Sequence, residues 1–216
     1  MIKKKYVLVI DASRNRSGGA IVYIKNFIKN LNINSTEIEK VILFSYKGLL
    51  KQISNRPFLT KLSHPFLEKN VLLQIIWQIF CLPFFLKKKD NNILFSTDST
   101  SFCKHELSIV FNQDILSFDH KALKQTPFGL DKIRLYIIKL VQIWAMNNAS
   151  KIIYLSKFSK EIISKSLNKK KNYEIIYHGI DKKLLKYGKK KIKDFPWDYN
   201  KKKKIKLIYV SPLDHY

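Results

Sequence analysis

Cysteine is scarce in this sequence. Only Cys81 and Cys103 are present among its 216 residues. Two cysteines are too few for a disulfide framework or for a metal site built on cysteine. The histidines also show no spacing typical of a ligand set, so we expect no metal. So little cysteine is typical of a protein that works in a reducing compartment.

Long apolar runs are also missing. The longest, residues 71–86, contains Gln74, Gln78 and Pro83 and is shorter than the roughly 20 residues that a membrane-spanning helix requires. An earlier apolar run, residues 6–10, ends at Asp11 and is too short for the core of a secretion signal. We therefore predict a cytoplasmic protein in which residues 71–86 form a buried or interfacial helix.

Arginine and acidic residues are few, although the formal net charge is +25. Only four of the 41 basic residues are arginine. Proteins that read nucleic acids rely on the planar fork of arginine, so the composition argues against a specific nucleic-acid partner. A lysine excess accompanied by much Asn, Ile and Phe is typical of an A/T-rich genome. An anionic membrane surface remains a candidate partner, because diffuse attraction needs only charge.

Short apolar runs alternate with segments of helical periodicity. The runs predict strands at residues 6–10, 41–45, 92–96, 107–112, 151–155 and 174–177. Helical spacing or capping predicts helices at residues 21–31, 49–53, 71–83, 131–147 and 157–167, the last with Ser156 as its N-cap. Residues 55–65 contain two prolines and are interpreted as a loop. The alternation predicts an α/β fold, a Rossmann-like doubly wound parallel sheet.

The composition changes near the C-terminus. We assign residues 1–181 to one domain and the lysine-rich residues 182–204 to a linker. Residues 206–210 have the pattern of a buried strand, which would be the first strand of a second domain at residues 205–216. One strand at the end of a chain leaves its backbone groups unpaired. We therefore expect the sequence to stop inside a truncated second domain.

Three loops at strand ends could bind a ligand. Ser17, Gly18 and Gly19 precede the first helix and form either an anion site or a tight turn. Gln113 and Asp114 follow a central strand, at the edge where open α/β sheets bind ligands, although the aspartate could equally cap a turn. His178, beside Gly179, could donate to a phosphate or be structural.

Taken in order, several segments resemble family 4 (group 1) glycosyltransferases of the GT-B fold, especially those that build bacterial surface polysaccharides. The resemblance covers nearly the whole chain and rests on the order and spacing of the segments. They are Ser17–Ala20, Phe111–Asp119, Ala149–Ser159, Ile176–Asp181 and Leu207–Pro212.

The resemblance implies two Rossmann-like domains that face a cleft. The N-terminal one would hold a saccharide or lipid-linked acceptor and the C-terminal one a nucleotide-sugar, without a metal or other cofactor. Gln113 and Asp114 would face the acceptor, with Asp114 as the candidate catalytic residue. The residues on the donor-phosphate side of the cleft would be Gly18, Gly19, His178, Gly179 and Ser211.

These expectations describe a cytoplasmic glycosyltransferase of surface polysaccharide synthesis, peripheral on the inner membrane. Because the nucleotide cannot be held by half of a cleft, the resemblance implies that this chain alone is inactive. The alternative from another class is a basic α/β module that binds nucleic acid or an anionic membrane surface.

Overall fold

The computed structural model describes residues 5–16, 18–87, 91–168 and 170–179. The chain divides into two compact units, Met1–Ile176 and Tyr177–Tyr216. Of the second unit, only residues 177–179 are described. The predicted linker, the predicted strand 206–210 and Ser211 lie outside the described residues.

The first unit is built on one parallel sheet of seven strands, in the order β3-β2-β1-β4-β5-β6-β7. The predicted Rossmann-like doubly wound fold is therefore confirmed. The strands are β1 (Tyr6–Asp11), β2 (Ile38–Phe44), β3 (Leu59–Leu62), β4 (Asn92–Ser96), β5 (Ser108–Asn112), β6 (Lys151–Tyr154) and β7 (Tyr173–Ile175).

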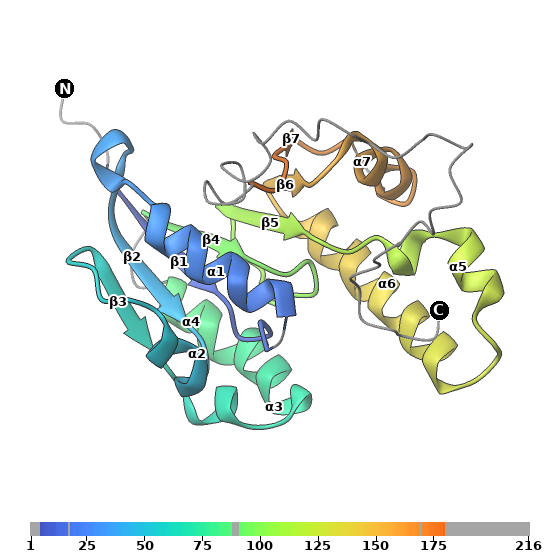
Figure 1. The fold of residues 1–216 in the computed structure, drawn as a ribbon, viewed down its shortest axis with the longest axis horizontal. Helices are drawn as coiled ribbons and strands as arrows, with labels where there is room; N and C mark the ends of the chain where they lie inside the picture. The colour runs from blue at the N-terminus through green and yellow to red at the C-terminus, as the bar shows by residue number, and fades with distance from the viewer. Residues whose placement is uncertain (1–4, 17, 88–90, 169, 180–216) are drawn as a thin grey trace, which may run out of the picture. The chain divides into compact units, whose positions relative to one another are not determined.

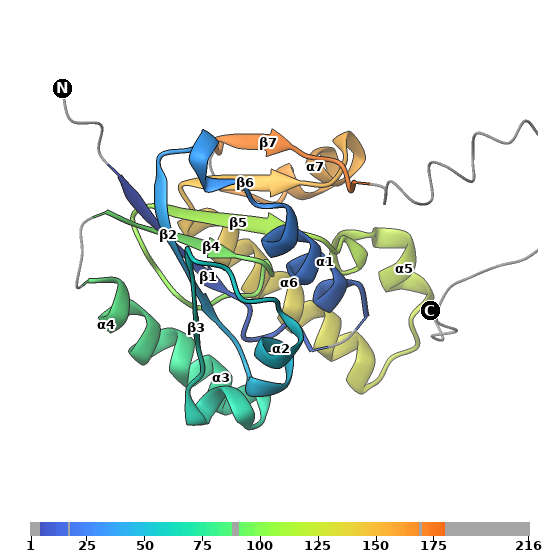
Figure 2. The same cartoon turned by 60° about the vertical axis from the view of Figure 1, so that its left-hand side comes forward.

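Helices cover both faces of this sheet (Figures 1 and 2). One face packs against α1 (Gly18–Asn30) and α2 (Lys47–Gln52). The opposite face packs against α4 (Leu82–Leu86), α6 (Leu130–Asn148) and α7 (Lys157–Ser164), and α3 (Val71–Ile76) precedes α4 in the chain. The short α5 (His120–Gln125), which we did not predict, is capped by the Asp119 side chain.

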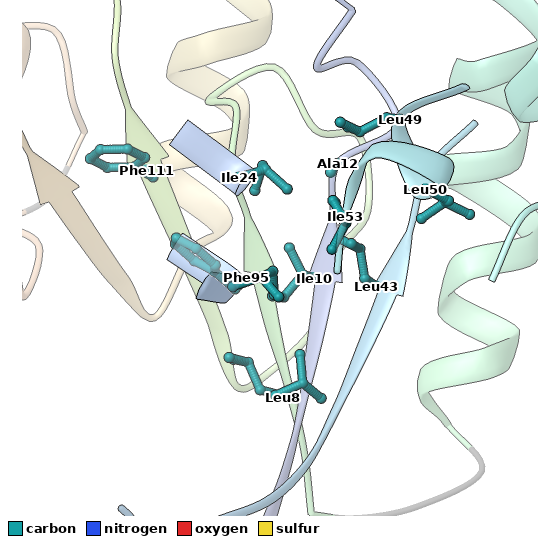
Figure 3. Close-up of a cluster of buried hydrophobic side chains, with 12 residues drawn as sticks. Leu8, Ile10, Ala12, Ile24, Leu43, Leu49, Leu50, Ile53, Phe95 and Phe111 are labelled. Atoms are coloured by element: carbon teal, nitrogen blue, oxygen red, sulfur yellow. The ribbon is translucent and has the colours of Figure 1, made fainter. Parts of the chain in front are cut away.

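The two-sided covering explains why the strands are continuously apolar. Successive residues of a strand point to opposite faces. In β1, Leu8 and Ile10 pack beneath α1 and α2, whereas Val7 and Val9 pack in a cluster with Trp77 and with Leu82 and Leu86 of α4. Figure 3 shows the first cluster, in which Ile24 of α1 meets side chains of the central strands. An uninterrupted apolar run is thus the pattern of a strand that is buried on both faces.

The loop predicted for residues 55–65 is wrong in part, because it contains β3. This strand is four residues long, lies at the edge of the sheet and is only half-buried. Short edge strands carry a weak apolar signal, and the flanking prolines obscured it further.

The helix predicted to end at Pro83 continues to Leu86. A π-helical turn, Trp77–Cys81, joins α3 to α4, and the N–H of Leu82 bonds to the carbonyl of Trp77 five residues earlier. Pro83 therefore lies in the first turn of α4, where a proline needs no N–H partner. The wide turn accommodates the proline without ending the helix.

Helix α6 lies where we expected it, but its apolar stripe does not enter the core. Most of the residues that we predicted on this stripe are exposed, namely Ile133, Tyr136, Ile137, Leu140 and Trp144. The buried residues of α6 are instead Gln142, Ala145 and Met146. Among the described residues, no helix combines the length and the apolar character needed to cross a membrane.

Candidate functional site

The sheet changes direction between β1 and β4. From β1 the chain builds outward through β2 and β3, and it then returns to β4 on the other side. At such a switch point the loops that follow the two strands diverge and leave a crevice at their carboxyl ends, which is where open α/β sheets bind ligands. The segments that meet there are residues 12–16 after β1, residues 97–101 after β4 and residues 113–115 after β5.

Asp11, the last residue of β1, is the centre of a buried polar network at this edge. Its Oδ1 accepts from the backbone N–H of Ser13 (3.1 Å). Its Oδ2 accepts from Nε2 of Gln78 (2.8 Å) and from Oγ of Ser101 (3.2 Å). Gln78 comes from the π-helical turn, and its Oε1 accepts from the N–H of Phe102 (3.3 Å). One carboxyl therefore connects a strand, a helix and the loop after β4.

Burial raises the pKa of Asp11 above its usual value, and the hydrogen bonds from Ser13, Gln78 and Ser101 oppose this rise. Only 4% of the residue is exposed. The carboxyl has lost its water shell, so its charged form is disfavoured despite three donors. Asp11 thus joins three segments of the fold and has a pKa that its burial raises.

A second chain of hydrogen bonds connects the loops that we singled out from the sequence. Nε2 of Gln113 donates to the carbonyl of Thr97 (2.9 Å), and Oγ1 of Thr97 donates to Oδ1 of Asn15 (2.8 Å). Nδ2 of Asn15 then donates to the carbonyl of Ala20 in the first turn of α1 (3.2 Å). The end of β5, the end of β4 and the start of α1, which carries Gly18 and Gly19, are therefore joined at one edge.

Asn112, the last residue of β5, has an acceptor atom without a partner among the described residues. The residue is 1% exposed, and its Nδ2 donates to Oγ of Ser99 (3.1 Å) and to the carbonyl of Asp114 (3.0 Å). Its Oδ1 is buried and accepts no hydrogen bond. A buried acceptor that lacks a donor is costly, and a ligand hydroxyl or a bound water would satisfy it.

The two predicted acceptor-side residues differ in their surroundings. Gln113 is half-buried, and its amide is engaged with Thr97. Asp114 is exposed, and its Oδ1 accepts from the N–H of Leu116 (2.8 Å), so it caps the turn that follows. The turn-capping interpretation of Asp114 thus describes its observed contact, and its proposed catalytic role stays a prediction.

Of the predicted donor-side residues, Gly18 and Gly19 belong to the described part of the first unit. Gly18 and Gly19 are exposed, and among the described residues, chain neighbours and the backbone of α1 aside, no heavy atom would lie within 4 Å of a Cβ added to either. Gly18 has a φ of 53°, a left-handed conformation that favours glycine. Nothing in the described fold requires glycine at position 19. His178 and Gly179 are exposed and belong to the second unit, and Ser211 lies outside the described residues.

Asp11, Gln78 and Asn112 were not predicted as site residues. A signal was present for each, since Asp11 and Asn112 end apolar strands and Gln78 interrupts an apolar helix. The hydrogen bond between Asp11 and Gln78 could not be predicted, because 67 residues separate the two in sequence.

The chemistry available at this edge is that of hydroxyl, amide and carboxylate groups. Arg14 adds a cation, with Nε 3.7 Å from Oδ2 of Asp98. In the part of the chain that the structure describes, no group of three or more His, Cys, Asp or Glu side chains could hold a metal. Such an edge offers hydrogen-bond donors and acceptors of the kind that pair with hydroxyl groups.

Fold and site together define a Rossmann-like α/β domain with a polar switch-point edge. Comparison with protein-family models finds none that matches the chain, and comparison with curated proteins finds no matching sequence.

We expect Asp11→Asn to remove part of the pH dependence of stability. A raised pKa in the folded state means that the stabilisation contributed by protonated Asp11 is complete below the unfolded pKa of about 3.9 and is lost as the pH rises through the folded pKa. The free energy of unfolding of the wild type, minus that of the variant, should therefore fall as the pH rises above about 4. Urea unfolding at a series of pH values measures it, and two parallel pH curves would contradict the shift.

Alanine at the two glycines should have opposite effects on stability. Gly18→Ala forces a side chain into the left-handed region and should cost about 1 kcal/mol. Gly19→Ala meets no neighbouring atom and should gain about 0.5 kcal/mol by restricting the unfolded chain. Urea unfolding of both variants checks this. An equal loss in both would mean that the fold, rather than a ligand, requires glycine at position 19.

Proposed function

We propose that this chain supplies the acceptor-side domain of a GT-B glycosyltransferase that transfers a sugar from a nucleotide-sugar to a saccharide or lipid-linked acceptor. The proposal rests on the sequence resemblance to family 4 enzymes of surface polysaccharide synthesis. The observation that carries it is the polar switch-point edge, to which β1, β4, β5 and the start of α1 all contribute.

The groups at this edge support a sugar as the ligand. Saccharides present many hydroxyls, and each needs a donor or an acceptor once it is buried. Oδ1 of Asn112 offers an acceptor that the described fold leaves unsatisfied. The open space around Gly19 at the start of α1 leaves room for a phosphate to approach backbone amides at a helix N-terminus.

The arginines support this proposal over a nucleic-acid module. Three of the four arginines contact other residues of the described fold. Arg14 faces Asp98, Arg16 donates to the carbonyl of Leu67 and stacks 4.5 Å from the Tyr46 ring centroid, and Arg56 donates to the carbonyl of Lys29. Arginines that are engaged in this way are not available to read bases.

Ligand titrations test the proposal. We expect the addition of glucose, galactose, N-acetylglucosamine or mannose to the 15N-labelled chain to shift the amide signals of the acceptor-side residues Gln113 and Asp114 for at least one of these sugars. Asn112→Ala should weaken this binding by roughly tenfold, a typical cost of leaving one buried hydrogen bond unmade.

Asn55→Ala is the matched control, because Asn55 is exposed and lies in the segment before β3. Urea unfolding of both variants separates a lost contact from a lost fold. Silence of these amides toward every sugar, together with a response to duplex DNA or RNA, would favour the nucleic-acid alternative.

A peripheral position on the cytoplasmic face of the inner membrane is the second part of the proposal. One side of the α3–α4 helix is exposed and apolar, with Leu72 at 70%, Phe80 at 67% and Phe84 at 68% exposure. Their spacing of eight and four residues places them on one face of the helix. Exposed Lys69 and Lys87 stand at its two ends. An apolar face with lysines beside it is what an interfacial helix requires.

We expect Phe80→Ser with Phe84→Ser to reduce sedimentation with liposomes that contain anionic lipid. The matched control is Phe128→Ser with Phe158→Ser, since these two phenylalanines are 91% and 59% exposed on other parts of the unit. Each buried phenylalanine contributes on the order of 1.5–3 kcal/mol, so the first pair should weaken binding by at least about tenfold. Equal loss in both pairs would assign the attraction to general hydrophobicity, and no loss would assign it to charge alone.

A further inference from the structure

A pocket lies at the edge of the sheet, away from the switch point. It opens between α7 and the start of β7 and has a volume of about 480 Å³. This volume falls within the range of pockets that bind small molecules. The residues that give it chemical character are Tyr154, Lys160, Asn168, Lys170, Lys171 and Tyr173. No part of the proposed transfer chemistry uses these residues.

The lining is strongly cationic. Lys160, Lys170 and Lys171 contribute three positive charges, and none of the described residues that line the pocket is acidic. The carboxylate of Glu174, the next residue of β7, is engaged with Nζ of Lys151 at 3.1 Å. Nζ of Lys171 donates to the carbonyl of Ala149 (3.0 Å), which anchors this side chain. The positive charges of the pocket thus have no counter-charge in its lining.

Two tyrosines give the pocket a rigid wall. Tyr154 is 2% exposed, and its ring centroid lies 6.1 Å from that of Tyr173. Nζ of Lys160 lies 5.1 Å from the centroid of the Tyr173 ring, so the ring positions this ammonium group. Burial raises the pKa of Tyr154 to about 12, and its hydroxyl is therefore a neutral group at pH 7 that does not repel an anion. Asn168 and Ser164 add further polar groups.

We propose that this pocket binds the phosphate group of a phosphorylated small molecule or of a lipid headgroup. Lysines bind phosphate as mobile point charges, and the hydroxyl and amide groups beside them can donate to phosphate oxygens. A diffuse lysine surface would attract anions everywhere, whereas three lysines around one concave, acid-free lining concentrate the field at one place.

Titration of the 15N-labelled full chain with inorganic pyrophosphate tests the proposal. We expect saturable shifts of the amide signals of Lys160, Ser164, Asn168, Lys170 and Tyr173. Lys160→Gln with Lys170→Gln should weaken binding by roughly tenfold, since two of the three charges are removed. Lys171 is left in place because it holds the carbonyl of Ala149.

The control removes the same net charge elsewhere. Lys121→Gln with Lys124→Gln changes two exposed lysines of α5, and we expect less than about a twofold loss of affinity. A second titration, with phosphatidylcholine vesicles that contain phosphatidic acid, distinguishes the source of the phosphate. A difference between the two double variants with either probe supports the pocket, and the probe that shows it identifies the ligand as soluble or lipid-borne.

Equal weakening by the two double variants with both probes would overturn the proposal, because binding would then follow the net charge of the whole surface. Absence of saturable binding to both probes would overturn it as well. Urea unfolding of the variants excludes a loss of fold as the cause. The result does not depend on the proposed transferase function, which is tested at Asn112 and at the amides of the switch-point edge.

Discussion

The hydrogen bonds of Asp11 hold the switch-point edge together. This carboxyl lies at the end of the central strand β1 and accepts from three different segments, at Ser13, Gln78 and Ser101. Without it, the hydroxyl donor of Ser101 would be buried without its acceptor, and Nε2 of Gln78 would keep only Oγ of Ser13 as a partner (3.1 Å). Together with the hydrogen bonds of Asn15, Thr97 and Gln113, this carboxyl holds the loops that follow β1 and β4, and those loops form the candidate ligand edge.

The connection between β4 and β5 has a comparable influence. Parallel strands are usually joined by a helix, but residues 97–107 cross over without one. Cys103 of this segment packs in the core with Trp77, and Phe102 contacts the Trp144 ring with a centroid distance of 6.0 Å. Because the segment takes the place of a helix, Ser99 and Ser101 come close enough to bond to Asn112 and Asp11. The packing of this segment on one face of the sheet therefore places two serine hydroxyls at the edge of the sheet.

The high net charge is distributed between distinct roles. Most arginines stabilise the fold through backbone carbonyls, rings or Asp98. Among the described residues no lysine, a better hydrated cation, is fully buried, and three lysines line the pocket beside β7. The apolar faces of α3–α4 and α6 are exposed on the sheet side opposite α1. The composition shows only that the protein is basic. The structure distinguishes cations that contact other protein groups from cations that are available to a ligand.

The class of fold and most of its elements follow from local signals in the sequence. Strands such as residues 92–96 and the N-cap Ser156 were predictable because their signals are local, namely a continuous apolar run and a hydroxyl before a helix. Only the tertiary structure decided which face of α6 is buried, because burial depends on neighbours that are remote in the chain. It also decided that Gln78 meets Asp11 and that Oδ1 of Asn112 lacks a donor. Hydrogen bonds between residues far apart in sequence produce no periodic pattern in the sequence. The fold could therefore be predicted from the sequence, whereas the arrangement of the polar groups at the switch-point edge could not.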